Sequence, residues 1–330
     1  MSLAPAANTA ATVPARRSTL RAGVDPLLAS CLWGGMYVVS RASFGAIPPV
    51  TLAALRVVVG GLTLWVALRI AARRALAGSG DTGAAATWTR GDHLRGFWCG
   101  VVVAACIVTQ FLGTDLASAH DGALLTTVTP VFVVPLAWVL LGERPQWRIV
   151  AGMLVALAGV AVVVGTQAPG GSGSGASIVG DALLLFSAFA WALFTVLGAP
   201  LSRKFSALAA STTATLWSVL FLAPLAAVEL ALRPKGASAI ALTPGSVAAV
   251  LYLAWGATAL AWLLWYRGVA KLAANVAAVF FFAQPVVGGI LSSVFLHEAL
   301  PAGFWLGGLV LAAGILVVSW QPRKRQAAAT

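Results

Sequence analysis

The 330-residue chain contains few charged residues and few cysteines. Asp, Glu, Lys and Arg make up 9% of it, whereas hydrophobic residues make up 60% and the mean hydropathy is +0.93. A soluble domain carries about 25% charged residues, so this composition excludes a soluble globule, and the apolar excess must face lipid. The three cysteines, Cys31, Cys99 and Cys106, lie in or beside apolar runs, which excludes a disulfide framework and a metal-ligand spacing.

The basic residues are spread along the chain rather than gathered into one patch. A net charge of +12 would suit a nucleic-acid partner if the charges formed one surface. Here they lie between the apolar runs, which is typical of an integral membrane protein. We therefore predict an all-α integral membrane protein whose partners are the lipid bilayer and a small-molecule substrate, with no nucleic acid.

Charge-poor runs long enough to cross a bilayer predict ten transmembrane helices. They cover residues 24–44, 47–68, 95–118, 121–142, 147–166, 178–201, 205–231, 246–266, 272–297 and 301–320. With the N-terminus inside, the inner segments hold every Lys and Arg except Arg41, Arg56, Arg233 and Lys235. The positive-inside rule thus predicts a multi-pass protein of the plasma membrane (the bacterial inner membrane) with both termini in the cytoplasm.

The two halves of the chain repeat each other at an offset of 155 residues. Gly113 falls on Gly268, Pro130 on Pro285, Glu143 on Glu298, and Gly159 on Gly314. Because each half holds five spans, an odd number, the halves would be inverted relative to each other in the membrane. Inverted repeats place the substrate near the bilayer midplane, in a central cavity between the halves.

The repeat and the composition together define the predicted domain organisation. A disordered cytoplasmic tail, 1–23, precedes a first five-helix repeat, 24–165. A flexible linker, 166–177, leads to the second repeat, 178–320, and a basic cytoplasmic tail, 321–330, ends the chain.

Several short motifs, repeated in order, resemble a known family. They are Trp33-Gly34, Arg56, Gly142-Glu143-Arg144-Pro145, Gly268-Val269-Ala270, Ala273-Ala274-Asn275-Val276 and His297-Glu298-Ala299-Leu300. Together they resemble the EamA-type branch of the drug/metabolite transporter superfamily, over about residues 24–320. The resemblance implies a ten-helix basket in which spans 1–4 and 6–9 enclose the cavity and spans 5 and 10 pack outside.

The resemblance also implies a function. Known relatives export amino acids and other metabolites, so we expect a secondary transporter that exports a small metabolite, such as an amino acid or an amphipathic compound, by alternating access. The alternative is an importer or flippase of a sugar or activated sugar, and a more distant one is an intramembrane enzyme or a non-transporting sensor. No nucleophile–base pair, metal cluster or phosphate loop is found, so we predict no enzyme, no cofactor and no metal.

Pro130 and Pro285 fall near the middle of spans 4 and 9. A proline inside a helix frees the carbonyl four residues earlier, here those of Thr126 and Phe281. Matched interruptions in two halves indicate a binding site, and the alternative is a packing kink.

Aromatic and polar side chains recur on single faces of three other spans. These residues are Trp33, Tyr37 and Arg41 on span 1, Trp191 and Thr195 on span 6, and Trp255 and Trp262 on span 8. They either line the cavity or serve packing and lipid contact. An aromatic cavity would suit amphipathic or aromatic metabolites, or cations held over ring faces.

Three amides, Gln110, Asn275 and Gln284, lie within spans and either contact substrate or bridge helices. Arg41, Arg56 and Asp115 are the candidates for gating or coupling. Arg56 could pair with a substrate carboxylate or an acid, or extend toward the interface, and the resemblance favours a structural role. Asp115 is either a proton site or part of a solvated turn.

The acidic residues lie in loops or near span ends, so the sequence predicts no deep carboxylate that carries protons. We therefore expect facilitated diffusion, or weak coupling through Asp115 or a histidine. Gly303-x-x-x-Gly307 allows close helix contact. We expect a monomer, with a homodimer as the alternative.

Overall fold

The structure, a computed structural model, describes residues 16–78, 87–117, 122–123, 125–165, 175–233, 240–296 and 302–319. Over these ranges it is helical, with no strand. The basic tail, most of the linker 166–177 and Glu298 lie outside the described residues. So do residues 1–15 of the N-terminal tail. The remainder of that tail was expected to be disordered, but it is helical from Arg16 onward.

The helices follow the expected order of apolar runs. They are α1 (Arg16–Gly34), α2 (Met36–Ser43), α3 (Pro49–Gly78), α4 (Arg90–Leu116), the 3₁₀ turn η1 (Thr126–Val128), α6 (Thr129–Leu141), α7 (Trp147–Gly165), α8 (Gly175–Lys204), α9 (Ala207–Ala231), α10 (Pro244–Leu251), the π-helix η2 (Tyr252–Leu260), α11 (Ala261–Lys271), α12 (Ala274–Ala278), the 3₁₀ turn η3 (Val279–Phe282), α13 (Ala283–Leu296) and α14 (Ala302–Ser319).

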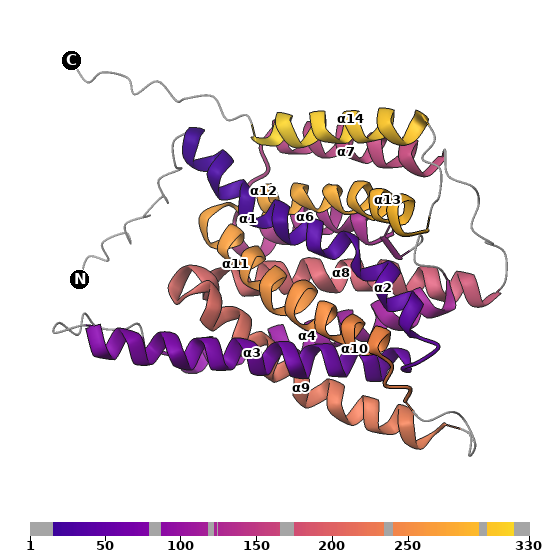
Figure 1. Cartoon of the computed structure of the whole chain (residues 1–330). Helices are drawn as coiled ribbons and strands as arrows, with labels where there is room; N and C mark the ends of the chain where they lie inside the picture. The colour runs from indigo at the N-terminus through magenta and orange to yellow at the C-terminus, as the bar shows by residue number, and fades with distance from the viewer. Residues whose placement is uncertain are drawn as a thin grey trace, which may run out of the picture.

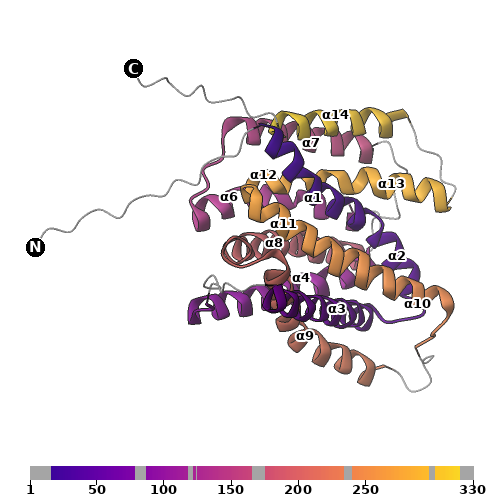
Figure 2. The same cartoon turned by 60° about the vertical axis from the view of Figure 1, so that its left-hand side comes forward.

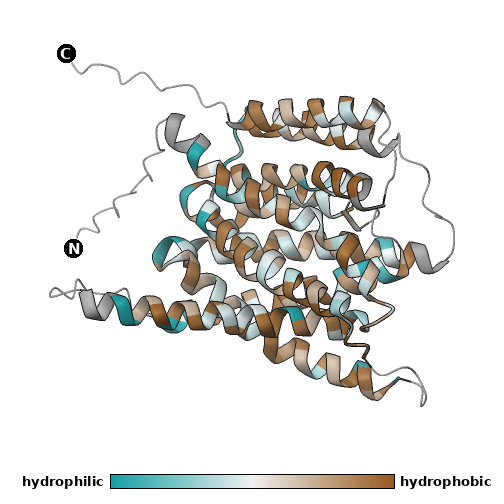
Figure 3. Cartoon of the chain, in the orientation of Figure 1, coloured by the Kyte–Doolittle hydropathy of each residue, from teal (hydrophilic) through white to brown (hydrophobic). Residues whose placement is uncertain are grey.

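Seven helical segments are long and apolar enough to cross a membrane, and three further apolar helices are shorter. The shorter ones are Thr126–Leu141, Trp147–Val162 and Ala302–Val318. Helix α1 begins on the side of the bundle where α14 ends (Figure 1). Apolar residues predominate along the helices, whereas hydrophilic residues gather at their ends (Figure 3). The protein is therefore an all-α, multi-pass membrane protein.

Four of the expected spans are not continuous α-helices. Span 4 contains the 3₁₀ turn η1 before α6. Span 1 divides at Gly35 between α1 and α2, and span 8 contains the π-helix η2 between α10 and α11. Span 9 passes from α12 through the 3₁₀ turn η3 into α13. In a membrane, such breaks are tolerated where backbone groups are buried in protein or line a cavity, and residues at the breaks in spans 1, 4 and 9 line the pocket described below.

α7 and α14 form a pair at one edge of the bundle (Figures 1 and 2). A Cβ atom added at Gly152 would lie 2.8 Å from the carbonyl oxygen of Gly314, and one at Gly159 would lie 2.7 Å from that of Gly307. The contact order reverses along the chain, so the two helices run antiparallel. Glycine allows this close backbone approach because it has no side chain.

The inner helices also meet at glycines. A Cβ at Gly113 in α4 would lie 2.8 Å from the Gly180 carbonyl oxygen of α8. A Cβ at Gly268 in α11 would lie 2.7 Å from Cδ of Pro26 in α1. Close contacts of α4 on α8 and of α11 on α1 therefore hold the centre of the bundle together.

Ion pairs join helices at the end of the bundle where α1 begins. Asp25 of α1 pairs with Lys271 of α11 at 2.8 Å, and Asp92 of α4 pairs with Lys204 of α8. Glu143, after α6, pairs with Arg203 at 2.7 Å and also accepts a hydrogen bond from the Ala274 backbone N–H of α12 at 2.8 Å. These contacts close the bundle below the pocket.

Candidate functional site: a pocket between the two halves

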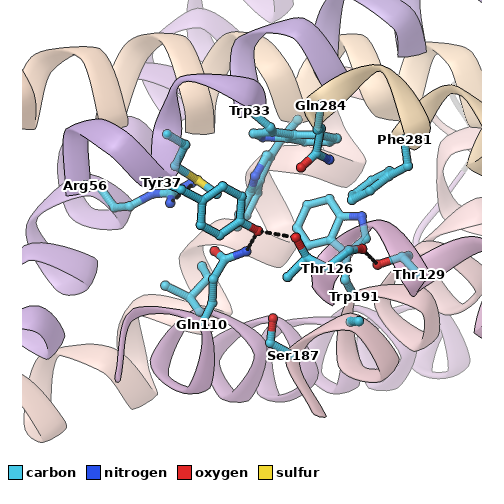
Figure 4. A pocket seen from close by; sticks show the side chains of 14 residues that line it. Trp33, Tyr37, Arg56, Gln110, Thr126, Thr129, Ser187, Trp191, Phe281 and Gln284 are labelled. Carbon is cyan, nitrogen blue, oxygen red and sulfur yellow. Dashed lines mark hydrogen bonds between the residues drawn. The ribbon is translucent and has the colours of Figure 1, made fainter. Parts of the chain in front are cut away.

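A pocket lies among α1, α2, α3, α4, η1, α6, α8, α11, η3 and α13 (Figure 4). The space not occupied by atoms among its lining side chains is about 360 Å³, part of which is open to solvent. Its lining residues are Trp33, Met36, Tyr37, Arg56, Ile107, Gln110, Thr126, Thr129, Ser187, Ala188, Trp191, Trp262, Phe281 and Gln284.

Most of the lining residues form pairs separated by the repeat offset of 155. The pairs are Trp33 with Ala188, Met36 with Trp191, Ile107 with Trp262, Thr126 with Phe281, and Thr129 with Gln284. Equivalent positions of the two halves therefore face the same space.

One wall of the pocket is a network of hydroxyl and amide groups. The Tyr37 hydroxyl lies 2.6 Å from Oγ1 of Thr126 and accepts a hydrogen bond from Nε2 of Gln110 at 2.8 Å. Tyr37 is 2% exposed. Figure 4 shows this hydroxyl between the two partners, directed into the pocket. The network fixes three polar side chains from three different helices.

The two prolines lie next to the pocket but not in its lining. Pro130 is within the first turn of α6, directly after η1, and Pro285 is the third residue of α13, directly after η3. The prediction of a proline inside a continuous helix is therefore wrong, because a 3₁₀ turn precedes each proline. The Thr126 carbonyl accepts a hydrogen bond from Oγ1 of Thr129 at 2.6 Å and is thereby satisfied.

The opposite wall consists of aromatic rings that contact one another edge-on or tilted. The Trp33 ring lies 5.0 Å from the Trp191 ring and 5.3 Å from the Phe281 ring, centroid to centroid. Nε1 of Trp33 donates to the Ala257 carbonyl at 2.8 Å, so this indole is held in place by the π-helix η2. Trp33, Trp191 and Phe281 are called the aromatic wall below.

Several buried polar atoms at the pocket have no hydrogen-bond partner in the described residues. They are Oγ of Ser187, Nε1 of Trp191, Nε1 of Trp262 and both amide atoms of Gln284. Gln284 is 1% exposed, and its amide points into the pocket (Figure 4). Buried polar groups are normally paired, because an unpaired one costs about 1–3 kcal/mol. These atoms are therefore available to a bound molecule.

Arg56 is buried beside the pocket rather than extended toward an interface. Its Nε donates to Oγ1 of Thr258 at 2.8 Å, and Nη2 donates to the Ala257 carbonyl at 3.2 Å. Nη1 contacts Sδ of Met36 at 2.9 Å, and the guanidinium lies 5.4 Å from the ring centroid of Phe111. None of these contacts is a carboxylate.

The structure places three of the other expected residues away from the pocket. Trp255 is 51% exposed, and its Nε1 donates to Thr63, so the prediction that it lines the cavity is wrong. The π-helix adds residues per turn, so Trp255 does not share a face with Trp262. Thr195 is buried behind the aromatic wall and accepts a hydrogen bond from Nε1 of Trp265 at 3.2 Å. Asn275 is buried in α12, and its Oδ1 has no partner in the described residues.

Arg41 and Asp115 meet each other outside the pocket. Arg41 Nη1 lies 2.8 Å from Oδ1 of Asp115, and the two side chains are 45% and 40% exposed. An exposed ion pair contributes about 0–1 kcal/mol.

No group of acidic, histidine or cysteine side chains that could hold a metal occurs within the described ranges.

Sequence reasoning did not select seven of the lining residues, namely Met36, Ile107, Thr126, Thr129, Ser187, Ala188 and Phe281. Met36, Ile107 and Ala188 are ordinary apolar residues in apolar spans. The signal that finds them is the repeat: each lies 155 residues from an aromatic residue of the other half.

Comparisons with known proteins agree with this architecture. The model of the EamA-like transporter family matches residues 26–165 and again residues 178–320. The uncharacterized transporter YetK of Bacillus subtilis is 32% identical over 62% of this chain, a match that spans 61% of that relative's length. The uncharacterized transporter YvbV of the same organism is 26% identical over 90% of this chain and 91% of its own length.

Two further similarities concern a named exporter and a solved structure. The aromatic amino acid exporter YddG of Salmonella typhimurium is 24% identical over 63% of this chain and 69% of its own length. A solved crystal structure superposes with a TM-score of 0.69 over 92% of this chain and 96% of that chain, at 23% identity, which shows a shared fold alone.

Proposed function

Because the chain belongs to the EamA-like transporter family, we propose that it is a secondary transporter that exports a small metabolite by alternating access. The proposed substrate class is an amino acid or an amphipathic compound of similar size. The observation that carries the proposal is the pocket, whose lining residues pair at the repeat offset and therefore come from both halves. A site between two repeats is where transporters of this kind bind substrate.

The proposed architecture is ten spans arranged as two inverted five-span repeats. Three features support it. α7 and α14 run antiparallel with reciprocal contacts, Gly152 with Gly314 and Gly159 with Gly307. The α4–α8 contact at Gly113 has its counterpart in the α11–α1 contact at Gly268. Pocket residues pair at the same offset.

The proposed orientation places both termini in the cytoplasm of a bacterial inner membrane, with one chain as the working unit. The excess of Lys and Arg in alternate segments supports the orientation. Single-cysteine variants in a cysteine-free background test the topology in intact cells. An impermeant reagent should label the 166–177 linker and spare the 75–92 loop; the reverse pattern would refute the orientation.

A metabolite-efflux screen tests the transport function. Cells with and without the gene are loaded with amino acids and toxic analogues, and export and resistance are measured with the amount of membrane-inserted protein. We expect faster efflux of a subset of compounds in cells that carry the gene. Identical profiles with the protein present in the membrane would count against export.

A further inference from the structure

We propose that the pocket binds its substrate through a carboxylate at Arg56 and an apolar body at the aromatic wall, and that it rejects cations that lack a carboxylate. The inference rests on the proposed function, since it takes the pocket as the substrate site. The substrate class is a small organic acid or zwitterion with an aromatic or apolar side chain.

The first argument is the incomplete set of partners around Arg56. A guanidinium has five N–H donors, and three hydrogen bonds are formed, to Thr258, Met36 and Ala257. Each of the three nitrogens therefore has one partner, and two of the five N–H groups have no hydrogen bond among the described residues, although the guanidinium also lies over the ring of Phe111. One of the three bonds uses a thioether, which is a weak acceptor. A buried charge without a counter-ion is costly. The missing partner is therefore an anion.

The second argument is the charge of the pocket. None of its 14 lining residues is Asp or Glu, so nothing in that lining neutralises Arg56. Charges interact more strongly where water is excluded. A carboxylate is therefore attracted to the pocket, and an organic cation is repelled by Arg56. The faces of aromatic rings can attract a cation, but here the positive charge of Arg56 repels it.

The third argument is the position of the unpartnered amide. Gln284 offers one free acceptor and two free donors, and Figure 4 shows its amide between Arg56 on one side and Phe281 on the other. Its Oε1 can accept a hydrogen bond from a substrate ammonium group. The carboxylate, the ammonium group and the apolar body of a zwitterion thus find Arg56, Gln284 and the aromatic wall, respectively.

Arg56 also supports the fold, because it bonds to two residues of the π-helix η2. The two roles have different consequences for binding. A purely structural arginine would affect the binding of every ligand equally. An arginine that binds a carboxylate affects only ligands that have one.

The experiment measures dissociation constants of four probes on the full chain in lipid nanodiscs. The probes are L-phenylalanine, 3-phenylpropionate, L-phenylalaninamide and phenethylamine, which vary the carboxylate and the ammonium group separately. On the unmodified protein, we expect the two acids to bind at least about tenfold more tightly than the amide and the amine. This arm needs no variant, so it does not depend on whether a mutant folds.

Two variants and one control extend the test. Arg56→Gln should weaken binding of both acids by about 10- to 100-fold and leave the amide and the amine nearly unchanged. Gln284→Leu should weaken L-phenylalanine relative to 3-phenylpropionate. Arg69→Gln, on the same helix but exposed over the ring of Trp65, should change neither acid.

Three outcomes would overturn the inference: equal binding of acids and amide, no binding of either acid, or an equal loss of all four probes in Arg56→Gln. The outcome is separable from the proposed function. Export of a metabolite that has no carboxylate would support the transport function and contradict the carboxylate site. Selective binding of the acids without any flux would support the carboxylate site and contradict the transport function.

Discussion

The two halves of the pocket contribute residues from equivalent sequence positions, but these residues differ in chemistry. At four of the five paired positions, the second half has the larger or more aromatic side chain, or an amide in place of a hydroxyl: Trp191 against Met36, Trp262 against Ile107, Phe281 against Thr126, and Gln284 against Thr129. Only Trp33 against Ala188 reverses the trend. Equivalent sequence positions thus form an asymmetric surface, with a hydrogen-bonding side and an aromatic side.

The largest expected effect comes from removing this asymmetry at one paired position. Trp191→Met gives the second half the side chain of its partner, Met36, and removes a ring from the aromatic wall. A buried aromatic anchor contributes about 2–4 kcal/mol to binding, so flux per folded molecule should fall by about 30-fold or more. Trp255→Met is the matched control, since Trp255 is 51% exposed and should keep its flux. Equal flux in both variants would remove the aromatic wall from the substrate site.

The second test addresses the packing of the helices rather than the pocket surface. In Gly159→Ala, the added Cβ would meet the backbone nitrogen of Leu311 at 2.6 Å, so α7 and α14 must separate. Overpacking of this kind costs about 1–3 kcal/mol, seen as a lower melting temperature of the purified protein. In Gly308→Ala, the nearest atom, Cγ2 of Val286, is 3.9 Å away, so the control should melt at or above the original temperature. A melting temperature as high for Gly159→Ala would refute the close pairing.

A smaller effect is expected on the hydrogen-bonding side. Tyr37→Phe removes the hydroxyl that joins Gln110 and Thr126 and should cost about 1 kcal/mol, with changed relative rates for polar and apolar substrates. Tyr252→Phe removes one hydrogen bond of 2.6 Å to the Leu32 carbonyl, outside the pocket. It should lower stability by a similar amount without changing substrate preference. A parallel change of preference in both variants would show that the effect is only one of stability.

The smallest effect is expected from the exposed pair outside both halves of the pocket. Asp115→Asn should change stability by less than about 1 kcal/mol and leave counterflow in proteoliposomes intact without a pH gradient. Proton-driven accumulation that is abolished by Asp115→Asn would instead make Asp115 a coupling site. The comparison between the halves would then be secondary to an outer gate formed by Arg41 and Asp115.

The apolar runs predicted the helices, because helix position in a membrane protein depends on hydropathy, and the repeated motifs predicted the family. Of the 14 lining residues, the sequence selected seven, including Trp33, Tyr37 and Gln284, and it also selected the two adjacent prolines. It did not predict where the helices depart from 3.6 residues per turn. That departure explains both the error at Trp255 and the 3₁₀ turns before the prolines. An apolar residue such as Met36 does not stand out in an apolar span. The repeat identifies it, because Met36 is equivalent to Trp191.

One backbone atom in the π-helix has a consequence for how such a site changes during evolution. The Ala257 carbonyl accepts hydrogen bonds from both Trp33 and Arg56, which come from two other helices. Its position depends on how η2 is wound, and η2 also has a lipid-facing side that carries Trp255. Substitutions on that side would shift both pocket residues together without altering either of them. Selection for a new substrate can therefore act on residues that never contact it.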